Sequence, residues 1–267
     1  MTVLARAAVL ALALWSGAVH AQPCDPCVLA DGGYRAVAPA GWDPSNRLKL
    51  LIFLHGWQNS AADILGDADV TGPAAEAGYL LVAPDGIGKR WSFRGNPTGG
   101  RDDIGFVHRV LEDVRRRWPI DPRFVVAGGF SIGASLVWDL ACHDAAGFTA
   151  FLPLSGGFWA PLPGSCTSGP VNLRQSHGRT DTTFPLAGRA VGQRMQQGNI
   201  IDGFSRWREV NNCLAQPSRH FYDGYLDCDD WVGCGSGLAL QLCLHPGGHM
   251  IEAHHIAAGL RWADRLH

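Results

Sequence analysis

The chain has 267 residues, and its 22 lysines and arginines against 24 aspartates and glutamates give a formal net charge of −2. This near-balance excludes a protein that binds nucleic acid through a basic face. Hydrophobic residues make up 46% of the chain and charged residues 17%, which excludes a disordered protein. The single long apolar run lies at the N-terminus, so a polytopic membrane protein is also excluded.

The first 21 residues have the layout of a secretory signal peptide. Arg6 precedes an apolar run from Ala7 to Trp15 that is too short to span a bilayer as a helix. Val19 and Ala21 then supply small residues at the −3 and −1 positions. We expect cleavage near Ala21/Gln22, secretion to the periplasm or the medium, and one catalytic domain over residues 22–267.

All eight cysteines lie after this segment, and an even number in an exported chain predicts disulfides. A metal site built on Cys24-x-x-Cys27 is the alternative, and it is disfavoured because the chain has no second Cys-x-x-Cys. The expected pairs are Cys142 with Cys166 and, among themselves, Cys213, Cys228, Cys234 and Cys243.

Short apolar runs alternate with helical patterns along the chain. The expected strands are Leu48–Leu54, Tyr79–Ala83, Phe124–Gly128, Ala150–Leu154, Val171–Ser176 and Leu238–Leu244. The expected helices are Ala61–Ala77, Ile104–Arg117, Ile132–Ala141, Phe204–Asn211 and Ala253–Leu266. Continuously apolar strands are typical of a parallel sheet buried on both faces. We therefore expect a single α/β domain with a mostly parallel central sheet, helices on both faces, and a ligand crevice at the carboxyl ends of the strands.

Gly129-Phe130-Ser131-Ile132-Gly133 matches the pattern G-x-S-x-G between a predicted strand and a predicted helix. A nucleophile elbow needs this context, because the sharp turn strains the serine and the helix N-terminus directs free N–H groups at the substrate. An ordinary glycine-rich loop is the alternative. The placement favours Ser131 as the nucleophile of an α/β-hydrolase fold.

A serine hydroxyl needs a base to take its proton, and the base needs an acid to orient it. In this fold the chain order is serine, acid, histidine. Asp181 follows the strand Val171–Ser176, and His249 lies in a glycine-rich loop after the last strand. We assign Asp181 as the acid and His249 as the base.

Other side chains could compete for these roles. The alternative acids are Asp202, Asp223 and Asp227, none of which closes a clear strand. A zinc site could use His249 with His245 and His254, but the Pro-Gly-Gly turn between them breaks the helix that such spacing needs. We expect no metal and no cofactor.

Developing oxyanion charge needs two backbone N–H donors. One is expected from Ile132, the residue after the nucleophile, and one from the loop that follows the strand Leu48–Leu54. In that loop Trp57 is the first choice and Gln58 the second. His55, in the same loop, is expected to pack the loop rather than carry a proton.

Several of these blocks occur in the order seen in secreted polyhydroxybutyrate-depolymerase-like esterases, a group that includes the feruloyl and acetylxylan esterases of carbohydrate esterase family one. The chain resembles that group from about Tyr34 to Leu266. The matching blocks are Leu54-His55-Gly56, Arg101 to Phe106, Gly129 to Gly133, His177 to Asp181, Trp207 to Cys213 and Gly247-Gly248-His249. The resemblance implies a serine carboxylic-ester hydrolase that acts through an acyl-enzyme, with Ser131, Asp181 and His249 as its triad.

The resemblance also implies an ester substrate with a short acyl group or a polymeric part, either a polyester or a plant polysaccharide. Trp91 and Trp159 lie in predicted loops and could stack on substrate, or could instead pack those loops. The segment from Gly178 to Gly237 is expected to set specificity. A serine peptidase and an inactive hydrolase-fold binding module are the alternatives. We expect a monomer that binds neither nucleic acid nor a membrane.

Overall fold

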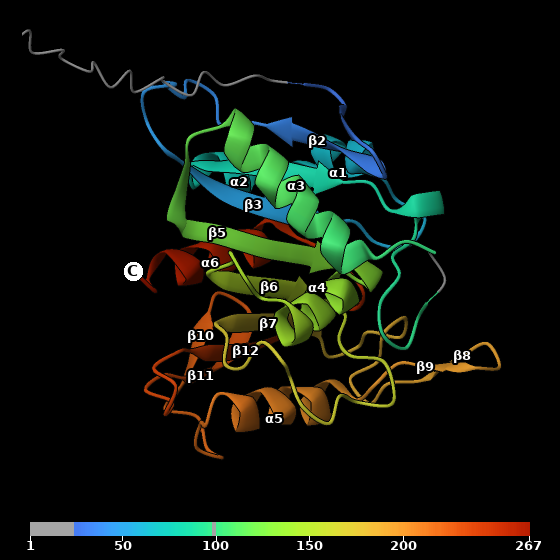
Figure 1. The fold of residues 1–267 in the computed structure, drawn as a ribbon. Helices are drawn as coiled ribbons and strands as arrows, with labels where there is room; N and C mark the ends of the chain where they lie inside the picture. The colour runs from blue at the N-terminus through green and yellow to red at the C-terminus, as the bar shows by residue number, and fades with distance from the viewer. Residues whose placement is uncertain (1–23, 98–99) are drawn as a thin grey trace, which may run out of the picture.

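The computed structural model describes residues 24–97 and 100–267, and the predicted signal peptide lies outside them (Figure 1). Strands from the start to near the end of the described chain form one ten-stranded sheet. In spatial order its strands are β1 (Cys27–Leu29), β2 (Gly32–Val37), β4 (Tyr79–Pro84), β3 (Leu48–Leu54), β5 (Ile120–Phe130), β6 (Ala150–Leu154), β7 (Leu173–Gly178), β12 (Leu240–His245), β11 (Leu226–Trp231) and β10 (Arg219–Asp223). A separate hairpin is formed by β8 (Ala190–Val191) and β9 (Met195–Gln196).

The middle of the sheet is parallel and its two edges are antiparallel. The parallel block runs from β4 through β3, β5, β6 and β7 to β12. On one side β1 and β2, and on the other β11 and β10, pair antiparallel with their neighbours. The six predicted strands are the six parallel ones, so the expected mostly parallel sheet is confirmed.

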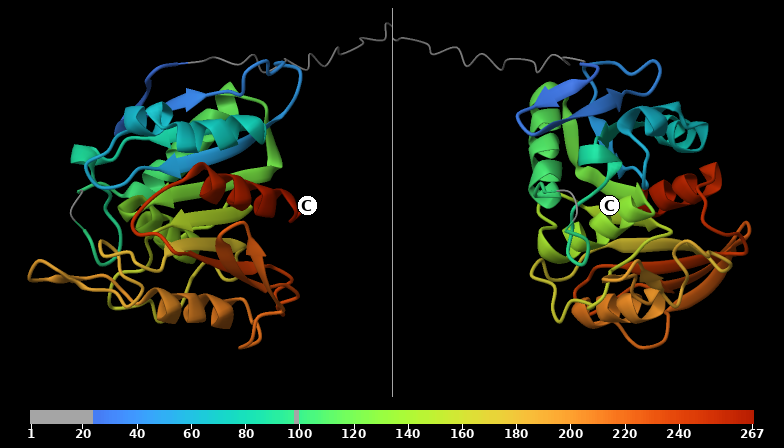
Figure 2. Two further views of the ribbon diagram at one scale, coloured as in Figure 1. Left: turned by 180° about the vertical axis from the view of Figure 1, so that it is seen from behind. Right: turned by 90° about the vertical axis from the view of Figure 1, so that its right-hand side faces the viewer.

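Helices cover both faces of the sheet, as expected (Figures 1 and 2). They are α1 (Ala61–Gly66), α2 (Ala68–Glu76), α3 (Asp103–Arg117), α4 (Ile132–His143), α5 (Ile200–Val210) and α6 (Ala253–Asp264), together with the short 3₁₀ turn η1 (Ile87–Lys89). One hydrophobic core lies under α3, α4 and α5, and the other lies under α1, α2 and α6. Within the described residues, no helix combines the length and the apolarity that crossing a bilayer requires.

Alternation along β3 explains why both faces are buried. Leu50 and Ile52 point into the core under α3 to α5, whereas Leu51 and Phe53 point into the core under α1, α2 and α6. Successive side chains of a strand face opposite sides, so a strand between two cores must be apolar at every position. The uninterrupted apolar run is therefore the signature of a central strand.

The predicted helix Ala61–Ala77 is two helices, and Asp67 separates them. Asp67 has an extended backbone (φ −87°, ψ 110°), and its carboxylate accepts a hydrogen bond from the N–H of Asp69 as the N-cap of α2. An N-cap residue leaves helical dihedrals in exchange for satisfying a free N–H group at the helix start. The prediction of one continuous helix is wrong for that reason.

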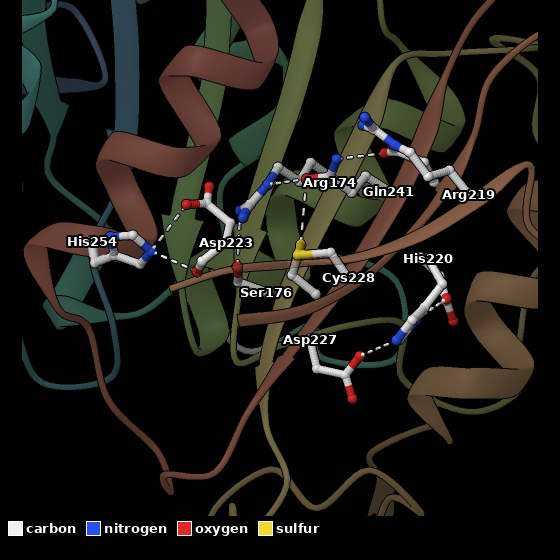
Figure 3. The surroundings of a disulfide bond; sticks show 12 residues. Arg174, Ser176, Arg219, His220, Asp223, Asp227, Cys228, Gln241 and His254 are labelled. Carbon is white, nitrogen blue, oxygen red and sulfur yellow. Dashed lines mark hydrogen bonds and ion pairs between the residues drawn. A yellow bond between two sulfur atoms is a disulfide. The ribbon is translucent and has the colours of Figure 1, made fainter. Parts of the chain in front are cut away.

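All eight cysteines form disulfides, and the two expected groups of pairs are confirmed. The bonds are Cys24–Cys27, Cys142–Cys166, Cys213–Cys234 and Cys228–Cys243. Cys228–Cys243 joins facing positions of β11 and β12 and so links the antiparallel strand β11 to the parallel block. Beside Cys228, the buried Arg174 donates to Gln241 at 2.5 Å and to Ser176 at 2.9 Å (Figure 3).

Candidate active site

Three parallel strands end at the same edge of the sheet, just before the predicted catalytic residues. β5 ends at Phe130, next to Ser131, while β7 and β12 end shortly before Asp181 and His249. The carboxyl ends of parallel strands face one way, so their loops meet above a common edge. The β8–β9 hairpin projects beyond this edge (Figure 1).

Ser131 occupies a strained turn between β5 and α4. Its backbone dihedrals are φ 57° and ψ −119°. Residues other than glycine rarely adopt a positive φ. The Ser131 N–H donates to the Leu154 carbonyl at 2.9 Å, and its carbonyl accepts from the Ser135 N–H at 3.0 Å. These bonds hold the serine in the geometry that a nucleophile elbow requires.

A close backbone contact at Gly133 joins this elbow to the loop after β3. A Cβ atom at Gly133 would lie 2.2 Å from the Leu54 carbonyl oxygen and 2.6 Å from that of His55. Only glycine permits this approach. The contact sets the N-terminus of α4 against the loop that carries Trp57.

The structure brings Asp181 and His249 together. The His249 Nδ1–H donates to Asp181 Oδ2 at 2.8 Å, and the Asp181 side chain is fully buried. The other carboxylate oxygen accepts the N–H groups of Thr183 at 2.9 Å and Phe184 at 2.8 Å. This arrangement leaves Nε2 of a neutral His249 ring as its proton acceptor.

The environment of Asp181 favours its charged form. Burial alone would raise the pKa of this carboxyl, but the hydrogen bonds from His249 and the Phe184 N–H outweigh it and hold the pKa below its usual value. Asp181 is therefore a carboxylate at neutral pH and can stabilise an imidazolium at His249.

A second close contact joins the loop after β7, which carries Asp181, to the loop after β12, which carries His249. A Cβ at Gly178 would lie 2.2 Å from the Gly248 carbonyl oxygen, and the Arg179 N–H donates to the His245 carbonyl at 2.8 Å. The His249 ring also packs on Phe130, with the ring centroids 4.7 Å apart. His249 therefore lies beside the residue that precedes Ser131.

The two first-choice oxyanion donors lie on the two segments that Gly133 brings together. Ile132 is the first residue of α4, where an N–H has no partner within the helix. Trp57 follows Gly56 in the β3 loop. The second choice, Gln58, donates its N–H to the Lys89 carbonyl at 3.1 Å, which leaves Trp57 as the donor that this loop can offer.

His55 packs the same loop, as expected. Its Nε2 accepts from the Gly86 N–H at 3.0 Å, so Nδ1 carries the proton and donates to the Gly56 carbonyl at 2.8 Å. Burial lowers the pKa of His55 and keeps the ring neutral.

The two tryptophans predicted to contact substrate have different environments. Trp91 is fully buried, and its indole N–H donates to the His55 carbonyl at 2.9 Å. This burial corrects the expectation that Trp91 contacts substrate, because the ring packs beneath the loop. Trp159 lines the cavity next to Ser131 and donates its indole N–H to Ser135 at 3.1 Å.

That cavity has a volume of about 380 Å³, and Ser131, Ile132 and Trp57 all line it. A larger cavity of about 580 Å³ is lined by residues that precede β6, β7 and β12, among them Thr149, Asn172 and Leu238, at the amino ends of these strands. It contains none of the predicted site residues. The crevice at the carboxyl ends is therefore the candidate active site.

Two of the three competing acids, and both competing histidines, have other partners. Asp223 accepts hydrogen bonds from Arg261, and Asp227 pairs with Arg179. The His254 ring contacts the Asp223 carbonyl (Figure 3). The His245 ring packs on His255, with the centroids 4.4 Å apart. Over residues 24–97 and 100–267, no three side chains of the metal-ligating types are placed to hold an ion.

No protein-family model matches the chain. Among curated proteins, the probable feruloyl esterase C of Aspergillus niger is 28% identical over 231 residues, which cover 80% of each chain. The feruloyl esterase C of Emericella nidulans is 32% identical over 158 residues, covering 56% of this chain and 55% of that one.

Solved esterases share the fold. The acetyl xylan esterase from Aspergillus awamori superposes with a TM-score of 0.62 at 14% identity, over 87% of this chain and 93% of that one. The feruloyl esterase module from Clostridium thermocellum, solved with sinapinate, gives a TM-score of 0.57 at 14% identity, over 98% and 96% of the two chains. The chain is similar to feruloyl esterases, and its fold is that of an α/β-hydrolase. It is a carboxylic ester hydrolase.

Sequence reasoning missed much of the cavity wall of this esterase. Six of the lining residues come from the segment 183–197: Thr183, Phe184, Arg189, Val191, Met195 and Gln197. The segment falls within the stretch expected to set specificity, but its short hairpin has no periodic pattern that would locate single residues. Arg90, from the loop after β4, was also missed.

Proposed function

We propose that this esterase is a secreted serine hydrolase whose triad is Ser131, Asp181 and His249. The observation that carries the proposal is the buried carboxylate of Asp181, hydrogen-bonded at 2.8 Å to His249, whose ring packs on Phe130 next to the strained Ser131. This is the constellation that activates a serine hydroxyl in hydrolases of this fold.

The mechanism follows from these positions. Ser131 Oγ attacks the ester carbonyl carbon as His249 Nε2 takes the hydroxyl proton, and the N–H groups of Ile132 and Trp57 stabilise the oxyanion. The proton passes from His249 to the leaving alcohol as the ester C–O bond breaks. Water then attacks the acyl-enzyme by the same route, which releases the acid and restores Ser131. No step requires a metal or a cofactor.

The proposed substrates are esters of hydroxycinnamic acids, including those linked to plant polysaccharides. The names of the curated relatives support this class. The cavity supports it as well, because Trp159, Phe184 and Met195 give it apolar walls beside Ser131 that can accept an aromatic acyl group. Polyesters and short acyl esters are the competing substrates.

The proposed location is outside the cytosol, after cleavage near Ala21/Gln22. Four disulfides in one chain fit an oxidising compartment. Mass spectrometry of the protein purified from its native host would give the mature N-terminus.

The test is to measure initial rates of purified residues 22–267 on methyl ferulate and on amorphous polyhydroxybutyrate, with Ser131→Ala as the blank. We expect ferulate release that falls by at least about 10⁴-fold in the variant. Release of hydroxybutyrate alone would replace the hydroxycinnamoyl proposal with a polyester one. A Ser131→Ala variant with a tenth of the wild-type rate would overturn the triad.

A further inference from the structure

The stretches of two loops that line the active-site cavity carry only basic charges, and Asp85 and Asp181 lie directly before these stretches. Residues 86–97 contain Lys89, Arg90 and Arg94, residues 182–199 contain Arg189 and Arg194, and neither segment contains an aspartate or glutamate. The chain as a whole has a net charge of −2. Positive charge is therefore concentrated around the site of a protein that is slightly acidic overall.

Two of these residues, Arg90 and Arg189, line the cavity itself, and no acidic residue lines it. The nearby acid, Asp181, is fully buried and is already bonded to His249 and two backbone N–H groups. Arg94 is different, because its backbone N–H donates to the buried Asp139 at 2.6 Å and its charge faces that carboxyl.

Neither cavity arginine has a carboxylate partner among the described residues, whereas Arg101 and Arg117 elsewhere in the chain each form an ion pair. The Arg90 guanidinium lies over the ring of Trp57, 5.2 Å from its centroid. Arg189 donates from Nε to the Thr183 carbonyl at 2.8 Å. Both side chains are exposed, so their remaining N–H groups are available to an anion.

The backbone fixes Arg189 in place. The Arg189 carbonyl accepts the Gln197 N–H at 2.9 Å, and the Gly198 N–H donates to the Phe158 carbonyl at 2.9 Å. Gln197 also forms a β-bridge with Trp159. The base of the β8–β9 hairpin is therefore bound to the segment that contains Phe158 and Trp159. A guanidinium group held in position binds a ligand at a lower entropic cost than a mobile one.

We propose that Arg90 and Arg189 make this cavity selective for esters that carry a carboxylate close to the scissile bond. The carboxylate could sit on the acyl part, as in the half-ester of a dicarboxylic acid, or on the alcohol part, as in an ester group borne by a uronic acid. The recognising chemistry is the same, a guanidinium fork on a carboxylate. This inference rests on the proposed function and names a substrate preference of the same site.

The test compares kcat/KM for two matched pairs of esters that differ by one carboxylate. The acyl-side pair is mono-4-nitrophenyl glutarate and 4-nitrophenyl pentanoate, with the enzyme-free rate subtracted. The alcohol-side pair is an acetyl ester of methyl galacturonide and the same ester of methyl galactoside. We expect the charged member to be favoured about tenfold in one pair, which identifies the side, and the preference to weaken with added salt.

The variant for this test is Arg90→Gln/Arg189→Gln, in which the ratio of the two kcat/KM values should fall toward one. The ratio cancels any general effect of the substitutions on folding. The matched control is Arg47→Gln/Arg265→Gln, which removes the same charge from the loop before β3 and from the C-terminal end of α6, and should leave the ratio unchanged.

Two results would overturn the preference: a ratio of one or less in both pairs for the wild-type protein, or a ratio that the double variant retains. A different result would overturn the proposed function. If neither methyl ferulate nor any of the four esters is hydrolysed in a way that Ser131→Ala abolishes, that function fails, and the carboxylate preference fails with it.

Discussion

The elbow region and the cavity walls of this esterase are built in opposite ways. The elbow joins β3, β5 and α4 through backbone contacts so close that Gly133 has no room for a Cβ. The walls are loops and a hairpin of two-residue strands, with exposed side chains such as Arg189 at their edge. In the proposed mechanism, the comparison teaches that buried backbone geometry positions the reacting groups, while exposed loop side chains select the substrate.

The largest expected effect is the loss of the nucleophile. Ser131→Ala should lower kcat on methyl ferulate by about 10⁴- to 10⁶-fold, because no other group in the proposed mechanism attacks the ester. Melting curves should show the variant folded, since the serine hydroxyl is absent from the core. Activity near the wild-type value would show that the strained turn at Ser131 does not carry the nucleophile, and the contrast between the elbow and the cavity walls would then not hold.

The next effect concerns the acid. Asp181→Asn should lower kcat by about 10³- to 10⁴-fold, because an amide NH₂ cannot accept the His249 Nδ1–H and the ring would lose its productive tautomer. Initial rates over a range of pH test this. A variant with kcat within tenfold of the wild type would show that a different acid orients His249.

A smaller effect is expected at Gly133. Gly133→Ala should lower kcat by about 10²-fold, because the added Cβ must push α4 away from the Leu54 carbonyl and so displace the Ile132 N–H. The matched control is Gly72→Ala in α2, where a Cβ meets nothing within 4 Å. The control should keep its activity and gain about 0.5–1 kcal/mol of stability.

Equal activity in the two glycine variants would show that the close contact at Gly133 does not position the oxyanion donor. Loss of folding in Gly133→Ala would be visible in its melting curve, and residual activity would then be measured on the folded fraction at lower temperature.

The smallest expected effect is a dependence of stability on pH. Burial lowers the pKa of His177 to about 4, so the folded state holds this ring neutral while the unfolded chain binds a proton below about pH 6.5. Between those values the unfolded state binds more protons, and the free energy of unfolding should fall as the pH falls. His177→Gln should show a shallower fall.

Urea unfolding at several pH values from 7 to 4.5 measures this slope. Buried His255, whose pKa burial lowers to about 3, adds to the same trend in both proteins. A wild-type slope equal to that of His177→Gln would contradict a neutral His177 in the folded state.

The sequence was sufficient for the centre of the fold but not for its edges. β3 and β6 match their predicted bounds because strands buried on both faces are apolar throughout. β11, which lies second from the edge of the sheet, was missed because Asp227, Asp229 and Asp230 interrupt its apolar positions. A two-residue strand such as β8 carries no pattern to detect.

The candidate site also contains residues that the sequence predicts and residues that only tertiary packing places. Residues that follow strand ends in chain order, such as Asp181 and His249, could be predicted to lie together because the fold dictates where those loops converge, and the structure places them in hydrogen-bond contact. Trp91 and Trp159 could not be told apart, because burial of a loop side chain depends on tertiary packing that local sequence does not encode. The same holds for Arg90 and Arg189, which meet only through the folded chain.

Covalent labelling tests the central claim, that Ser131 is the nucleophile, most directly. Purified residues 22–267 would be treated with paraoxon, which phosphorylates an activated serine, and digested for mass spectrometry while residual esterase activity is followed. The account predicts a single adduct on Ser131, activity lost in proportion to labelling, and no adduct in Ser131→Ala. An adduct on another residue, or full activity in fully labelled protein, would contradict it.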